Sequence, residues 1–275
     1  MGYRDILVEI SNTRPAKLRA ATAALLASRM QARLTGVFLK SNFISRFGDG
    51  GALGFMPPGV VETLMEDHAK SVAEASGAAQ KILAQAAEDA GVAFEWLEID
   101  GDRPGALTAC ARCFDLTILP TVVVASHGQT VTPAAEVAMG SGGPVLILPD
   151  AGFEPNFGKR VTIAWKSSRE SARALRDALP MLDSADEIFV VTVADAWPDD
   201  YLKAHFERLG LKAKFIVERQ TGTAPSDLLR LQTGKTGSDL MVMGLYGQPR
   251  LTELVLGGVS RDLLHNHALP LLVSH

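Results

Sequence analysis

Glycines near the C-terminus are the residues of this sequence best suited to holding a phosphate. In GLYGQPRLTELVLGGVSR, Gly244 and Gly247 have two residues between them, and Gly257, Gly258 and Ser260 follow nine residues later. Glycine tolerates positive φ and lets a ligand approach the backbone, so successive N–H groups can converge on an anion. A helix starting at the glycine pair would add free N–H groups and the positive end of its dipole. A tight turn with a close helix–sheet contact is the alternative, and the spacing alone leaves it open.

Other residues with reactive side chains fit structural roles better. Cys110 and Cys113 form a CxxC, but it closes a predicted helix, whereas a redox CxxC usually opens one. His265 and His267 would point to different faces of a predicted helix, and neither they nor His275 has an acidic or Cys ligand nearby in the sequence, so we expect solvated histidines. The sequence contains neither a G-x-S-x-G nor an H-E-x-x-H motif. We therefore expect no catalytic site and no metal site.

Ten short apolar runs alternate with longer helix-like segments, and these elements must position the glycines. Five runs lie in the first half, at residues 5–11, 32–39, 93–99, 115–120 and 144–149, and five in the second, at 159–166, 186–193, 213–219, 238–244 and 269–275. Continuous apolar strands suit a parallel sheet that is covered on both faces and joined by right-handed crossovers. We therefore predict an α/β fold with two tandem doubly wound sheets, each of five parallel strands. Ligands bind such sheets beyond the carboxyl ends of the strands, and Gly244 leaves one of these ends.

The two halves read as copies of one unit. ILVEISNTRPAKLRAATAALL in the first half parallels VTIAWKSSRESARALRDALPML in the second. Gly, Pro and Asn interrupt the chain at residues 150–159, which predicts domains at 1–152 and 153–275. The first half has Pro120 where the second has its first loop glycine, so we expect it to bind no nucleotide. Its last strand and neighbouring helix would instead pack against the second half as an intramolecular pseudo-dimer.

The G-x2-G-x9-G spacing, set between SDLMVMG and LPLLVSH, resembles the universal stress protein family over nearly the whole chain. The resemblance implies an adenine-nucleotide alpha-hydrolase-like topology and a tandem member whose first domain is degenerate. It also implies a site for ATP or another adenine nucleotide, with Mg²⁺. In that site Gly244, Gly247, Gly257, Gly258 and Ser260 would hold the phosphates and the ribose.

Some positions depart from the family pattern. Gly258 replaces the usual Ser or Thr, which removes a hydroxyl donor and keeps the N–H. Lys166 replaces an Asp that contacts the nucleoside in family members, so it would either abolish base recognition or supply a cation to the phosphates. Ser11 takes the same place in the first half. Val193 stands where family members offer backbone groups to adenine.

Composition limits the range of partners and locations. The chain of 275 residues has a net charge of -4 and a pI of about 5.9, so it has no cationic field for nucleic acid or an anionic membrane. The sequence has no signal peptide and no apolar run long enough to span a membrane, and we expect a cytoplasmic protein. The insert at residues 41–59 is rich in Gly, Pro and Phe and could act as a lid, pack as a flap or contact a ligand.

The leading hypothesis is a cytoplasmic stress-response protein that is not an enzyme. It would bind ATP or a related adenine nucleotide in its C-terminal half and signal this to an unknown protein partner, with homodimer formation also possible. The alternative is an interaction module that kept the fold and lost nucleotide binding. An enzyme that forms an adenylate would need a glycine-rich turn after the first strand, and the turns SNT and KSS lack one.

Overall fold

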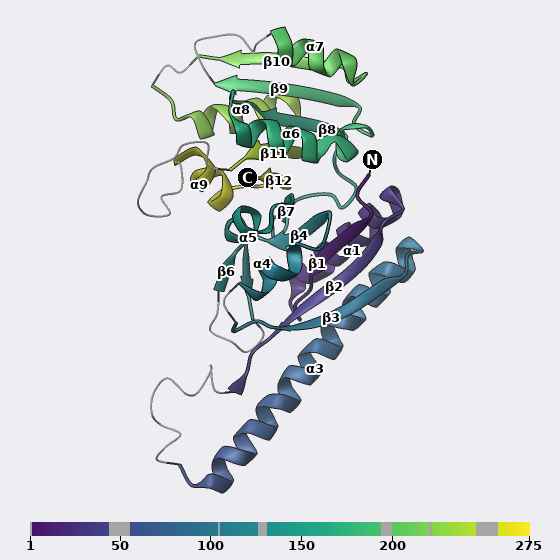
Figure 1. Cartoon of the computed structure of the whole chain (residues 1–275), viewed down its shortest axis with the longest axis vertical. Coiled ribbons are helices and arrows are strands. Elements are labelled where there is room, and N and C mark those ends of the chain that lie inside the picture. Colours follow the sequence, from purple (N-terminus) through teal and green to yellow (C-terminus); the bar gives the residue numbers. More distant parts are fainter. Residues whose placement is uncertain are drawn as a thin grey trace.

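One continuous sheet of ten strands forms the centre of the protein (Figure 1). The structure, a computed structural model, describes residues 2–43, 56–103, 105–125, 131–193, 200–219, 222–245 and 258–275. The strand order is β10-β9-β8-β11-β12-β7-β4-β1-β2-β3. The N-terminal half supplies β1 (Asp5–Glu9), β2 (Arg33–Lys40), β3 (Phe94–Asp100), β4 (Leu116–Pro120) and β7 (Val145–Leu148). The C-terminal half supplies β8 (Arg160–Ala164), β9 (Glu187–Val193), β10 (Ala213–Glu218), β11 (Leu240–Gly244) and β12 (Leu271–Ser274).

Neighbouring strands run parallel everywhere except at the centre of the sheet. There β7 and β12, the last strand of each half, pair antiparallel, with Leu272 opposite Leu146. Two parallel five-stranded units therefore meet edge to edge, which confirms the predicted fold class. The predicted division between 152 and 153 lies in the connection from β7 to β8 and stays a prediction.

Helices cover both faces of the sheet. They are α1 (Arg14–Met30), α3 (Pro58–Ala90), α4 (Ala106–Ala111), α5 (Ala134–Ser141), α6 (Arg169–Leu182), α7 (Asp200–Arg208), α8 (Pro225–Thr236) and α9 (Gly258–His265). Side chains of α1, α3, α6 and α7 pack in one buried layer, and those of α4, α5, α8 and α9 pack in the other. Each layer contains residues from both halves, so the halves share their hydrophobic core.

The N-terminal half departs from the predicted pattern at two places. After β4 the chain forms a small antiparallel pair, β5 (Val122–Val124) with β6 (Val131–Pro133), which the sequence analysis did not predict. The edge strand β3 is not buried on both faces as predicted: all seven of its residues are partly or fully exposed, and it has only one strand neighbour. Its residues alternate between the two faces, as expected of a half-covered strand.

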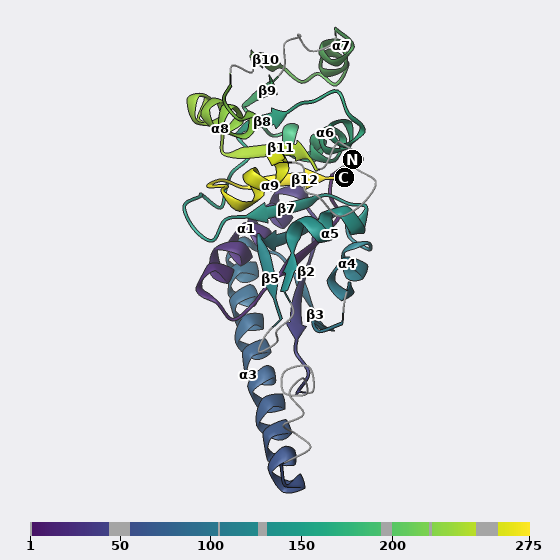
Figure 2. The same cartoon turned by 90° about the vertical axis from the view of Figure 1, so that its left-hand side faces the viewer.

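The helix α3 is much longer than the strands that it covers. Its 33 residues span about 50 Å at the usual rise per residue. Its first half extends away from the sheet in both views (Figures 1 and 2). Within the described ranges, no helix combines the length and the apolar character needed to cross a bilayer.

Candidate functional site

The carboxyl ends of β8, β9 and β11 meet at one edge of the C-terminal half. Ala164 lies opposite both Met243 of β11 and Val191 of β9. The strand order reverses here, since β9 follows β8 on one side and β11 lies on the other. This edge is therefore the switch point at which doubly wound sheets bind ligands. Lys166, Val193 and Gly244 all lie at it, as predicted from the sequence.

The turn after β8 presents Lys166 to solvent. Ser168 caps α6 by accepting a hydrogen bond from the N–H of Ser171 (3.3 Å), and the Ser171 hydroxyl accepts one from the N–H of Lys166 (3.3 Å). Lys166 forms no ion pair with any residue that the structure describes. These hydrogen bonds fix the backbone of the turn at the switch point, and the exposed Lys166 ammonium group is available there to an anion.

The sequence analysis did not single out Ser168 and Ser171, the two serines that shape this turn. Their signal is the pair of hydroxyls three residues apart in SSRES, directly after a strand. This pattern is typical of a helix start, and it could have been read as a device for fixing the Lys166 turn.

Gly244 is required by packing against α6. A Cβ atom at this position would lie 2.6 Å from the backbone nitrogen of Ser171 and close to the backbone carbon of Glu170. The first turn of α6 therefore packs directly on the end of β11. The helix–sheet contact that the sequence analysis left open explains this glycine without any ligand.

The predicted last helix is present as α9, which begins at Gly258. Gly258 is exposed and a Cβ there would meet no atom within 4 Å, whereas Ser260 is buried. The N–H groups of the first turn have no partners within the helix, so this end of α9 can donate to an anion. Gly247 and Gly257 lie outside the described residues.

An arginine of α8 holds α9 in place. Arg230 forms ion pairs with Asp262 of α9 (2.9 Å) and with Asp227 (2.8 Å). Hydrogen bonds from Ser226, Arg230 and Asn266 lower the pKa of Asp262. These donors hold the Asp262 carboxylate in place. The start of α9, at Gly258, stays exposed to solvent.

The residues present fit a polyphosphate better than they fit a base. Lys166 and the first turn of α9 supply positive charge and N–H donors, which suit phosphate oxygens. At the end of β9, Val193 offers backbone groups, and its side chain is partly buried against the core. Within the part of the chain that the structure describes, no side chain at these strand ends is a specific partner for adenine.

The corresponding edge of the N-terminal half is closed by a buried ion pair. Arg19 of α1 contacts the carboxylate of Glu9 at 2.5 Å and donates to the Glu9 carbonyl oxygen at 2.7 Å. Both side chains are buried, and burial raises the pKa of the Glu9 carboxyl while Arg19 opposes the rise. Arg19 also reaches the hydroxyl of Ser11 (3.5 Å). A guanidinium group thus lies directly after the first strand, where the C-terminal half presents the exposed Lys166.

The cysteines take the positions expected of structural residues, whereas His267 lies beyond the end of α9 and is partly buried instead of solvated. Cys110 lies in the last turn of α4 and Cys113 follows the helix, as predicted, and burial raises the pKa of the Cys110 thiol. The ring of His267 bonds Thr121 of the other half (2.8 Å) and the carbonyl oxygen of Leu269 (3.0 Å). His265 and His275 bond backbone carbonyl oxygens. The central part of the 41–59 insert, residues 44–55, lies outside the described residues, so its predicted roles stay open.

Comparison with known proteins identifies similar folds. No family model and no curated protein matches the sequence. A universal stress protein from Archaeoglobus fulgidus DSM 4304 superimposes with a TM-score of 0.70 at 15% identity, over 98% of this chain and 97% of that one. A putative universal stress protein from Pseudomonas aeruginosa UCBPP-PA14 gives 0.63 at 17% identity, over 99% and 93%. A functionally unknown protein from Pseudomonas aeruginosa PAO1 gives 0.62 at 16% identity, over 99% and 92%.

These similarities extend over both halves and the joint between them. At such low identities they concern the fold, and they agree with the resemblance seen in the glycine spacing of the sequence. The chain therefore has the fold of the universal stress proteins, with two units joined in one sheet.

Proposed function

We propose that the C-terminal half binds ATP or a related adenine nucleotide and that the protein acts as a regulatory stress-response protein in the cytoplasm. The observation that carries the proposal is the exposed Lys166 at the switch point, which has no ion pair among the described residues and lies beside the end of β11 from which the glycine-rich segment leaves. The start of α9 lies after that segment and offers N–H groups that have no partner within the helix. In this role the nucleotide binds with Mg²⁺, and its presence in the site is the signal to a protein partner. We assign no catalytic step to any residue.

Calorimetric titration with ATP and Mg²⁺ tests the proposal. We expect saturable binding to the unmodified protein and roughly tenfold or more weaker binding to Lys166→Ala, because a charged hydrogen bond to phosphate is lost. Lys81→Ala, which removes an exposed lysine from α3, is the matched control and should bind as the unmodified protein does. If Lys166→Ala and Lys81→Ala bound ATP with equal affinity, the nucleotide site would not be at Lys166.

A second candidate is an interaction module without nucleotide, and the packing of Gly244 removes one argument against it. Because the α6 contact already requires this glycine, its presence does not argue for a ligand. The same titration separates the two: no heat with ATP, ADP or AMP would make the interaction module the better description.

A further inference from the structure

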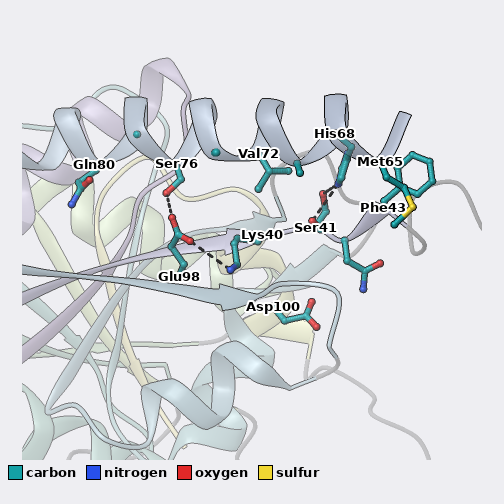
Figure 3. A pocket seen from close by; sticks show the side chains of 14 residues that line it. Lys40, Ser41, Phe43, Met65, His68, Val72, Ser76, Gln80, Glu98 and Asp100 are labelled. Carbon is teal, nitrogen blue, oxygen red and sulfur yellow. Dashed lines mark hydrogen bonds and ion pairs between the residues drawn. The ribbon is translucent and has the colours of Figure 1, made fainter. Parts of the chain in front are cut away.

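A cavity of about 780 Å³ lies in the N-terminal half, between α3 and the carboxyl ends of β2 and β3 (Figure 3). It shares no residue with the candidate nucleotide site. Its volume is within the range of small-molecule sites, about 300–1,000 Å³. We call it the α3 groove. Its lining residues are Lys40, Ser41, Asn42, Phe43, Met65, His68, Ala69, Val72, Ala73, Ser76, Gly77, Gln80, Glu98 and Asp100.

Small residues on α3 leave the groove open. Toward its C-terminal end the helix packs tightly on the sheet, because Gly36 of β2 has no side chain and leaves space for Leu83 and for the ring of Trp96. Nearer its start, Ala69, Ala73 and Gly77 succeed one another at four-residue intervals and line the cavity. A Cβ at Gly77 would meet no atom within 4 Å. One wall of the groove is therefore long, shallow and mostly apolar.

The opposite wall carries an unbalanced negative charge. Glu98 and Asp100, two residues apart on β3, are both exposed and both line the groove; Glu98 reaches toward Ser76 of α3, and Asp100 lies at the end of the strand (Figure 3). Glu98 is partnered: it accepts a hydrogen bond from Ser76 (2.5 Å) and its other oxygen lies 3.5 Å from the Lys40 ammonium group. Asp100 accepts a backbone N–H from Asp102 (3.1 Å) and has no basic partner among the described residues. Lys40 offsets one of the two carboxylates, so one negative charge remains among the described residues of this wall.

From this combination we propose that the α3 groove binds a small, elongated amphipathic molecule that carries a cationic nitrogen. Its apolar part lies along Ala69, Ala73 and Gly77 of α3, and its cationic end lies at Asp100. An anionic molecule of the same shape would face Glu98 and Asp100, with Lys40 already paired. Asp100 thus selects a ligand with a positive charge, and the wall of alanine and glycine residues selects a ligand with an elongated apolar part.

Two amphiphiles of equal chain length and opposite charge test the proposal. The full chain is titrated calorimetrically with decyltrimethylammonium and with decyl sulfate, both below their micellar concentrations. We expect saturable binding of the cation at one site and weaker or no binding of the anion. Tetramethylammonium, which lacks the apolar chain, should bind far more weakly than decyltrimethylammonium. Tighter or equal binding of decyl sulfate, or no saturable binding of the cation, would overturn the proposal.

Three variants locate the site. Asp100→Asn keeps the shape and removes the charge, and it should weaken binding of the cation by roughly fivefold or more. Ala73→Phe fills the groove from an exposed helix position and should abolish binding, with the fold checked by circular dichroism. Asp89→Asn removes an equal charge from the far end of α3, where Asp89 bonds Gln85, and should bind as the unmodified protein does. Unchanged binding in a folded Ala73→Phe variant would exclude the groove.

Discussion

Gly244 and Gly258 come from one sequence motif, yet their surroundings differ. The side of Gly244 where a Cβ would lie is filled by the backbone of Glu170 and Ser171, whereas Gly258 faces open space. Gly244→Ala should lower the free energy of unfolding by about 2 kcal/mol or more, because β11 or α6 must shift. Gly258→Ala should change it by no more than about 1 kcal/mol. Urea unfolding of both variants measures the difference, and similar values for the two would contradict the packing explanation.

His267 makes stability depend on pH where the two halves meet. Its Nδ1 donates to the Leu269 carbonyl oxygen, and in the neutral ring Nε2 accepts the hydroxyl of Thr121. Burial lowers the pKa of His267 below its usual value of 6.5. The unfolded chain then binds this proton more readily than the folded one, so stability should fall as pH drops through about 6.5.

The measurement is the midpoint of thermal unfolding between pH 7.5 and pH 5.5. In His267→Asn the loss of stability over this interval should be smaller than in the unmodified protein. His265→Asn is the control, because this exposed ring bonds a carbonyl oxygen within its own helix. If His265→Asn flattens the profile and His267→Asn does not, the assignment to His267 is wrong.

At the scale of elements, the two halves differ in the turn after their first strand. In the N-terminal half α1 inserts Arg19 against Glu9, and both side chains are at most 4% exposed. Removing one partner leaves a buried charge unpaired, so Arg19→Met should lower the free energy of unfolding by about 3–5 kcal/mol. Replacing both residues, Glu9→Leu with Arg19→Met, should recover most of that loss. Denaturant unfolding of the single and double variants checks the prediction, and additive losses would mean that the pair does not interact.

The sequence predicted the elements better than the contacts between them. All ten sheet strands and the start of α9 were predicted, because apolar runs and glycine interruptions are local signals. The β5–β6 pair was missed because its three-residue strands are too short for a pattern to stand out. Arg19 and Glu9 were not singled out either, since ten residues and a turn separate them and no local pattern links them. Of the candidate site, the strand-end positions of Lys166, Val193 and Gly244 could be predicted, and the serines that hold the Lys166 turn were overlooked.

At the scale of the whole molecule, the joint between the halves is part of the core. The apolar strands β7 and β12 are buried throughout and pair with each other at the centre of the sheet. The connection between the halves also packs on the N-terminal half: Phe157 is buried and its carbonyl oxygen accepts a hydrogen bond from Arg29 of α1 (2.9 Å). The next residues belong to the other half, since Asp239 accepts the N–H groups of Gly158, Lys159 and Arg160 (each 3.1 Å).

This arrangement predicts how separate halves behave. A fragment of residues 1–157 should be more stable than one of residues 1–152, because it keeps Phe157 and the partner of Arg29. Both fragments lack β12, so the edge of β7, whose apolar residues are buried in the intact chain, becomes exposed. Each fragment should therefore self-associate by antiparallel pairing of β7 with the β7 of a second copy. Sedimentation over a range of concentrations measures the association, and thermal unfolding compares the two fragments.

A variant with a charge on the exposed edge of β7 is the control for self-association of the fragments. Leu146 is fully buried opposite Leu272 in the intact chain, and Leu146→Lys in the 1–157 fragment should prevent association by placing a charge in the new β7 pair. If the 1–152 fragment is folded, monomeric and as stable as the 1–157 fragment, the result would instead support a domain division at residue 152. It would also mean that the joint contributes little to the stability of either half. Association of 1–157 that the lysine abolishes would mean that the N-terminal half needs a partner at β7, which the C-terminal half supplies within the same chain.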